Sequence, residues 1–256
     1  MATEKQRSSN VEQRGSPWHL QGSHGVLDSR LRGDVDLLRP GLGFRLQACD
    51  EDSIHATLLS VIMPGSPLAT GRGEALIESY SRGSDLVARY AETPDRSVRP
   101  ECYWRYVDRV GDALIIEVLI SVQTSLLASE PAIHTRSILP AGELARIDVD
   151  QQFRLHPLGS SELTASSGLG ILVVRSQAFV NWTYAEMIYP SDYIGGRVTA
   201  GEASIELVFD LFPESLEKGV IRRARVRGCW VPRDGDREHI RQAYEQFVAA
   251  PLPLTA

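Results

Sequence analysis

IEVLISVQTSLLASEPAI, residues 116–133, and IELVFDLFPESLEKGVI, residues 205–221, are two stretches of one chain with nearly the same pattern. Apolar residues alternate along both, 89 positions apart: Ile116, Val118, Ile120 and Val122 in the first, and Ile205, Leu207, Phe209 and Leu211 in the second. A period of two is typical of a β-strand that buries one face. The stretches therefore predict two long strands with corresponding core faces.

The residues around these stretches indicate a duplicated β unit. On the other strand face Glu117 corresponds to Glu206, and ARYAE, which ends at Glu92, corresponds to WTYAE, which ends at Glu186. The alternative is chance, because strands draw on a narrow set of apolar residues. The predicted segments are an extra strand group at 24–62 and two copies at about 74–140 and 168–232, each with about five strands.

The rest of the chain fits one β domain at 18–256, preceded by a disordered tail at 1–17. Short apolar runs are broken by turn sequences such as RPG, MPGSP and TGRG. One helix is predicted at about 236–250, where apolar residues recur at helical spacing, with Asp234 or Asp236 as its cap. We therefore predict a mainly β fold: a large antiparallel β-sandwich of two repeated β units with one C-terminal α-helix.

A two-copy β chain of this length resembles the two-sheet supersandwich of galactose-mutarotase-like proteins. The resemblance implies a supersandwich-like architecture. It carries no residue assignments, because none of that family's catalytic residues is placed on this sequence by a motif.

Composition limits the possible partners. The formal net charge of −6 at pH 7 argues against general nucleic-acid binding, which needs an excess of basic residues. The apolar runs are too short to span a bilayer, and the polar N-terminus lacks the apolar core of a signal peptide, so we expect a cytoplasmic protein. Cys49, Cys102 and Cys229 are far apart and predict free thiols rather than a disulfide framework or metal site. Neither a metal nor a cofactor is expected, and the oligomeric state stays open.

No strong catalytic motif is present in the sequence: it has no GxxxxGK[ST], GxSxG or HExxH pattern. Weaker candidates lie on predicted strands. In PECYWRYV, residues 100–107, Tyr103 and Arg105 share one face and would suit stacking on a sugar ring or holding a carboxylate. The alternative is that Arg105 closes a structural ion pair.

Two further predicted strands carry polar residues in a pattern that is typical of strands lining a cavity. Glu117 and Gln123 share a mixed polar and apolar face. In AIHTRSI, His134 and Arg136 align with Ala224 and Val226 of the second copy, which indicates that they line a cavity or satisfy each other. If neighbouring strands bring these residues to one side with Arg105, they form a ligand site; the alternative is that Glu117 pairs with an arginine as architecture.

One more strand, GVIRRARVRG, places Arg223, Arg225 and Arg227 on one face. Such a ladder could grip an anion, but a solvated face paired with acidic neighbours is the favoured interpretation.

Three functional hypotheses follow. The first is a soluble β-sandwich protein that binds a polar or anionic small molecule, such as a carbohydrate or sugar acid. A second is an epimerase or lyase with Glu117 or Glu186 and His134 as acid and base. The third is a protein-interaction scaffold that uses a sheet edge or the C-terminal helix.

Overall fold

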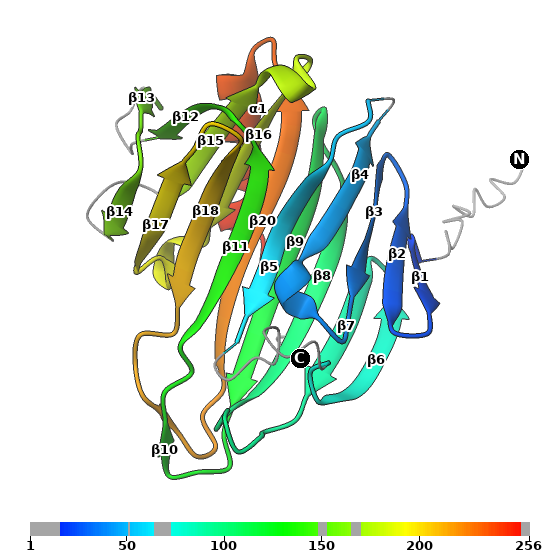
Figure 1. The fold of residues 1–256 in the computed structure, drawn as a ribbon, viewed down its shortest axis with the longest axis vertical. Helices are drawn as coiled ribbons and strands as arrows, with labels where there is room; N and C mark the ends of the chain where they lie inside the picture. The colour runs from blue at the N-terminus through cyan, green and yellow to red at the C-terminus, as the bar shows by residue number, and fades with distance from the viewer. Residues whose placement is uncertain (1–15, 51, 64–72, 148–152, 165–169, 252–256) are drawn as a thin grey trace, which may run out of the picture.

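Two large antiparallel sheets pack face to face in the computed structural model, which describes residues 16–251 apart from 51, 64–72, 148–152 and 165–169 (Figure 1). The tail predicted at 1–17 lies almost wholly outside these described residues. Sheet A runs in the order β1 (Trp18–Gln21), β2 (His24–Asp28), β3 (Leu31–Asp36), β4 (Phe44–Cys49), β5 (Ala56–Ile62), β11 (Ile133–Pro140), β18 (Ser204–Leu211), β17 (Gly195–Ala200) and β14 (Ser161–Thr164). Sheet B runs in the order β13 (Leu155–Pro157), β12 (Gly142–Ile147), β15 (Ile171–Ser176), β16 (Trp182–Ile188), β20 (Arg222–Pro232), β9 (Ala113–Gln123), β8 (Arg99–Val110), β7 (Asp85–Tyr90) and β6 (Leu76–Arg82). The mainly β sandwich fold is confirmed.

The core between the sheets is built by the alternation seen in the sequence. The predicted core residues of β9 and β18 are all at most 2% exposed: Ile116, Val118, Ile120, Val122, Ile205, Leu207, Phe209 and Leu211. Burying an aliphatic side chain of this size contributes roughly 1.5–3 kcal/mol. The two quoted stretches therefore supply much of the force that holds the sheets together.

The chain leaves each of these strands by the same route. β9 leads through β10 (Ala128–Ser129) to β11 in the opposite sheet, and β18 leads through β19 (Leu216–Glu217) to β20. The two short strands pair with each other, β11 pairs with β18, and β20 pairs with β9. Among the described residues, 74–140 and 168–232 each hold five strands of at least six residues and one of two residues. The internal repeat itself stays a prediction.

The predicted alignment of β11 with β20 is wrong by one residue. His134 and Arg136 point away from the core, whereas Thr135 and Ser137 are fully buried on the inner face. In β20 the inner face carries Ala224. Because side chains alternate, a shift of one residue exchanges the two faces of a strand.

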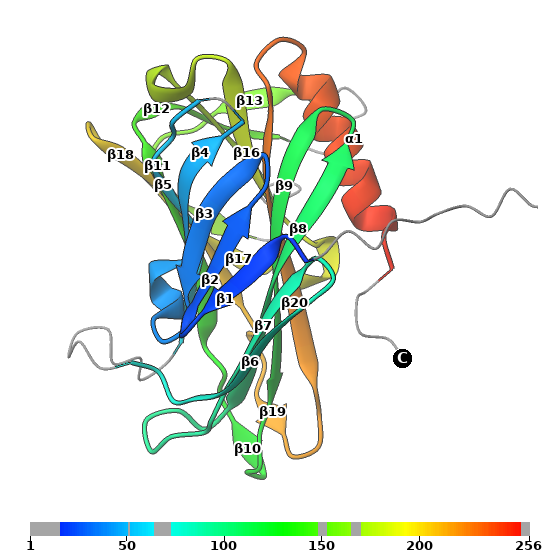
Figure 2. The same ribbon diagram turned by 90° about the vertical axis from the view of Figure 1, so that its right-hand side faces the viewer.

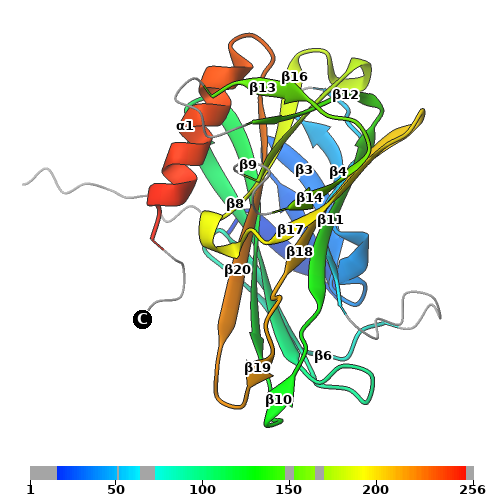
Figure 3. The ribbon, with the colours of Figure 1, turned by 90° about the vertical axis from the view of Figure 1, so that its left-hand side faces the viewer.

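Helix α1 (Asp236–Ala249) covers one end of the outer face of sheet B (Figures 2 and 3). Ile240, Ala243 and Phe247 are fully buried against the sheet, and Tyr244 is half-buried. The helix prediction is therefore confirmed, and the sheet occupies the apolar face of α1.

The predicted cap of α1 is wrong. Gly235 occupies the cap position with a φ of +70°, a conformation that glycine adopts without strain. Asp236 instead faces the sheet, where it receives two hydrogen bonds of 2.8 Å from Arg175 and one of 2.7 Å from Thr183. The acidic residue thus anchors the first turn to sheet B rather than capping the helix.

The described residues also include three short 3-10 segments and three cysteines. Single-turn 3-10 segments lie at Pro40–Leu42, Gln177–Phe179 and Pro190–Asp192. Cys49, Cys102 and Cys229 are buried and free. Within the described part of the chain, no helix is long and apolar enough to cross a membrane.

The carboxyl group of Glu186 lies in the core between the sheets. Glu186 of β16 is fully buried, and its Oε2 accepts hydrogen bonds from Ser137 Oγ of the opposite sheet and from Tyr184 Oη, the latter at 2.6 Å. Its Oε1 has no hydrogen-bond partner among the described residues. Burial raises the pKa of Glu186 from 4.5 to about 7. The folded state therefore favours the neutral carboxyl group.

The free energy of unfolding is expected to depend on pH through Glu186. Because its pKa is higher in the folded state, the folded protein binds the extra proton between about pH 4.5 and 7, and stability falls as the pH rises through that window. The shift corresponds to about 3 kcal/mol. Glu186→Gln removes this component, so the variant should be more stable than the parent at pH 8 and similar at pH 4.5.

Urea unfolding at a series of pH values measures this difference. Glu206→Gln, which removes a half-exposed carboxylate from sheet A, is the matched control and should leave the pH dependence almost unchanged. A Glu186→Gln profile parallel to that of the parent would contradict the assignment.

Candidate ligand-binding site

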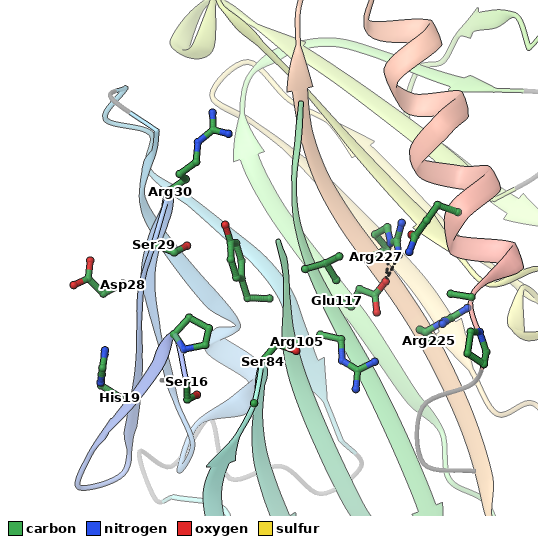
Figure 4. A pocket seen from close by; sticks show the side chains of 17 residues that line it. Ser16, His19, Asp28, Ser29, Arg30, Ser84, Arg105, Glu117, Arg225 and Arg227 are labelled. Carbon is green, nitrogen blue, oxygen red and sulfur yellow. Dashed lines mark hydrogen bonds and ion pairs between the residues drawn. The ribbon is translucent and has the colours of Figure 1, made fainter. Parts of the chain in front are cut away.

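A cleft of about 1330 Å³ opens on the outer side of sheet B (Figure 4). One wall is the end of α1, and the other is formed by β1, β2 and the turn that follows β2. The floor comes from β8, β9 and β20. The lining residues are Ser16, Pro17, His19, Asp28, Ser29, Arg30, Gly83, Ser84, Arg105, Tyr106, Val107, Glu117, Arg225, Arg227, Gln246, Ala250 and Pro251.

Four charged residues form a row that begins on β7, beside the cleft, and crosses the three strands of its floor. Asp85, Arg105, Glu117 and Arg227 are register partners on β7, β8, β9 and β20, so acidic and basic groups alternate from strand to strand. We call these four residues the charge row. Arg105 donates two hydrogen bonds to Asp85, at 2.6 and 2.8 Å, and Arg227 Nε donates one to Glu117 at 2.7 Å. The row is therefore internally neutral.

Glu117 and Arg227, the two residues of the charge row nearest to helix α1, are buried. Glu117 is 3% exposed and Arg227 1% exposed, whereas the side chain of Arg105 is 28% exposed. Arg227 also donates from Nη1 to the Ala243 carbonyl of α1 at 2.7 Å and lies 4.6 Å from the centre of the Phe247 ring. Arg105 thus presents its guanidinium to the cleft, while the Glu117 and Arg227 pair fixes the floor.

Arg225 lies beside the charge row, on β20, under the last turn of α1. Its Nη2 donates to the Phe247 carbonyl at 2.6 Å, and its guanidinium lies 4.3 Å from the Phe247 ring centre and 4.7 Å from that of Tyr189. A cation near the C-terminus of a helix is favoured by the helix dipole. Burial nevertheless lowers the pKa of Arg225.

Two of the predicted site residues lie on sheet B outside the cleft lining. Tyr103 packs with Val87 and Leu119 and donates a hydrogen bond to Glu101, and burial raises the pKa of its phenol. Gln123 is exposed at the end of β9. The structure therefore brings only Arg105 and Glu117 of the predicted set into the cleft.

His134 and Arg136 lie on the outer face of sheet A. Arg136 donates to the Gly41 carbonyl at 3.5 Å, and burial is the main cause that lowers the pKa of His134. The expected convergence of this pair with Arg105 and Glu117 is wrong, because β11 belongs to the other sheet. Glu186 lies between the sheets, so the expected acid and base pairs are not assembled in the cleft.

The sequence interpretation missed several lining residues and misjudged others. Arg30, which pairs with Asp50 at 2.7 Å, comes from the turn after β2, and no sequence motif connects it to β9. The arginines of β20 were expected on a solvated face, but Arg225 and Arg227 are at most 2% exposed. The signal for their burial was the amphipathic helix that follows them, since it must cover some face of a sheet.

Comparisons with known proteins give weak matches of structure alone. No family model matches the chain, and no curated protein matches it. A candidate aldose 1-epimerase from Klebsiella pneumoniae subsp. pneumoniae matches with a TM-score of 0.40 and 8% identity, over 67% of this chain and 58% of that one. The GalM/aldose epimerase homologue from C. elegans matches with a TM-score of 0.34 and 13% identity, over 63% of this chain and 69% of that one. A candidate kojibiose phosphorylase from the human microbiome matches with a TM-score of 0.35 and 8% identity, over 66% of this chain and 21% of that one.

The charge row predicts a strong coupling between Glu117 and Arg227. Arg227→Met should lower the free energy of unfolding by about 3–5 kcal/mol, because it leaves the Glu117 carboxylate buried without its cation. The double variant Glu117→Gln/Arg227→Met should recover much of that loss. Urea unfolding of the parent, the two single variants and the double variant measures the coupling energy.

Arg222→Met is the matched control on the same strand. Its ion pair with Glu214 is exposed, so we expect a loss below about 1 kcal/mol. Additive losses in the Glu117 and Arg227 variants would show that the two side chains act independently.

Proposed function

We propose that this protein binds a hydroxylated small molecule, a carbohydrate or sugar acid, in the cleft on sheet B. The observation that carries the proposal is the charge row on the cleft floor. Arg105 is the exposed member of the row, and its guanidinium can donate hydrogen bonds to the hydroxyl or carboxylate oxygens of a ligand.

The accessible arginines support this class of ligand. The side chains of Arg30 and Arg105 are 34% and 28% exposed, and the carboxylates of Asp50 and Asp85 hold them in place. A guanidinium that is already oriented loses less conformational entropy when it binds a ligand. Ligand pockets commonly have volumes of about 300–1,000 Å³. A cleft of about 1330 Å³ is therefore large enough for a sugar with room for further groups.

Binding has more support than catalysis by the residues first considered. An epimerase or lyase with Glu117 or Glu186 and His134 as acid and base requires these groups to meet at one substrate. Glu117 is buried against Arg227, Glu186 lies in the core, and His134 is on sheet A. We therefore place ligand binding first.

We further infer that 74–140 and 168–232 are two copies of one unit. The shared route through β10 and β19 and the equal numbers of strands among the described residues support this inference. Superposition of the two ranges should place Glu117 over Glu206. A poor match of the long strands would contradict duplication.

We also infer a reducing, cytoplasmic location from the thiols. Three buried free cysteines suit a compartment in which disulfides are rare.

The ligand proposal is tested by thermal shift and calorimetry with sugars and sugar acids. A ligand at 100 times its Kd stabilises the folded state by about 2.7 kcal/mol, which raises Tm by roughly 5–10 °C for a chain of this size. Arg105→Met should weaken binding at least about tenfold, because a charge-assisted hydrogen bond is lost.

Arg136→Met is the matched control, since it removes an arginine from the outer face of sheet A. Its ligand affinity should equal that of the parent. The proposal fails if no sugar or sugar acid binds the parent, or if the two variants lose affinity equally.

A further inference from the structure

Arg225 differs from the other arginines that line the cleft. Arg30 pairs with Asp50, Arg105 with Asp85 and Arg227 with Glu117. Among the described residues no carboxylate lies within ion-pair distance of the Arg225 guanidinium, and its Nε has no hydrogen-bond partner. Among the described residues, Arg225 is therefore the one arginine of the cleft lining without an ion-pair partner.

Such a cation is costly to bury. Arg225 is only 2% exposed, and its charge is offset by the Phe247 carbonyl, by two aromatic faces, and by the Glu117 and Asp192 carboxylates, which lie beyond ion-pair distance of its guanidinium. A buried charge is normally paired with an opposite charge, and an unsatisfied buried polar group in a native protein calls for a physical reason. Because Arg225 lines the cleft, an anion bound there would supply an opposite charge next to its guanidinium.

We infer that Arg225 is the subsite for an oxyanion of the ligand, which makes the preferred ligand an acidic sugar derivative rather than a neutral sugar. This inference rests on the proposed function. The oxyanion can be a carboxylate or a phosphate, because both accept hydrogen bonds from a guanidinium. The Glu117 carboxylate also attracts Arg225, but its hydrogen bond goes to Arg227 at 2.7 Å, so Arg225 keeps its donors for a ligand.

The position of Arg225 determines which way the ligand is oriented along the floor of the cleft. On the neighbouring strand Arg225 faces Leu119, one row away from Glu117 and Arg105. Strands in a sheet lie about 4.8 Å apart, so β20 and β8, which flank β9, are about 10 Å apart, close to the length of a monosaccharide that carries an acidic group. The acidic end therefore lies at Arg225 beneath α1, and the hydroxyl groups lie toward Arg105.

The competing role for Arg225 is purely structural, as a clamp that holds the last turn of α1. A clamp does not discriminate between charged and neutral ligands. Charge selectivity therefore separates the two roles.

Isothermal titration calorimetry with glucose, glucuronate and glucose 6-phosphate provides the test. The parent should bind glucuronate or glucose 6-phosphate at least about tenfold more tightly than glucose, and added salt should reduce this preference. The acid that binds more tightly identifies whether the oxyanion is a carboxylate or a phosphate. Arg225→Met should abolish the preference, so that glucose and the two acids bind with similar affinities.

Arg223→Met is the matched control, on the same face of β20 but outside the cleft lining. It should retain the full preference. If Arg225→Met does not fold, as judged by circular dichroism, Arg225→Lys replaces it; that variant keeps the charge and should keep part of the preference.

Two results overturn the inference while the proposed function stands: equal affinities of the parent for glucose and both acids, or an unchanged preference in Arg225→Met. Absence of binding to all three compounds overturns this inference, and the proposed function falls as well if no other sugar or sugar acid of the thermal-shift screen binds.

Discussion

The burial of sheet B on both faces is the constraint on which the candidate site depends. Trp230 of β20 packs in the core between the sheets, while Cys229 packs under α1. Arg225 and Arg227 lie on the helix-covered face and bond to carbonyl oxygens in its last two turns. Charged groups in such a place need fixed partners. By covering this face and bonding to Arg225 and Arg227, the helix holds the side chains of the cleft floor in fixed positions.

Much of the fold could be predicted from the sequence because its main signals are local. The alternation in 116–122 and 205–211 determines which face of each strand is buried, and the helical spacing of Ile240, Ala243 and Phe247 determines how α1 docks. These patterns depend on the chain's own geometry and hold in any strand order. The cap prediction was wrong because the partners of Asp236, Arg175 and Thr183, are distant in the sequence and are brought to it only by the fold.

The candidate site was harder to predict because it depends on which strands are neighbours. Sequence alternation placed Arg105 and Glu117 on strand faces that proved to be adjacent, but it contained no information that β11 pairs with β18 in the other sheet. His134 and Arg136 were therefore grouped with residues they never meet. Arg30 was missed for the same reason, since 86 residues separate it from Glu117 within the chain.

The positions of the cleft residues in the chain determine the order in which the parts of the cleft are synthesised. Its walls are contributed by residues 16–30 and 246–251, and its floor by strands in between. A growing chain thus makes the first wall early and the second only after β20 has joined β9. Contacts between such distant segments form late and slowly in folding. The ability to enclose a ligand therefore depends on α1, which is the last element to be synthesised.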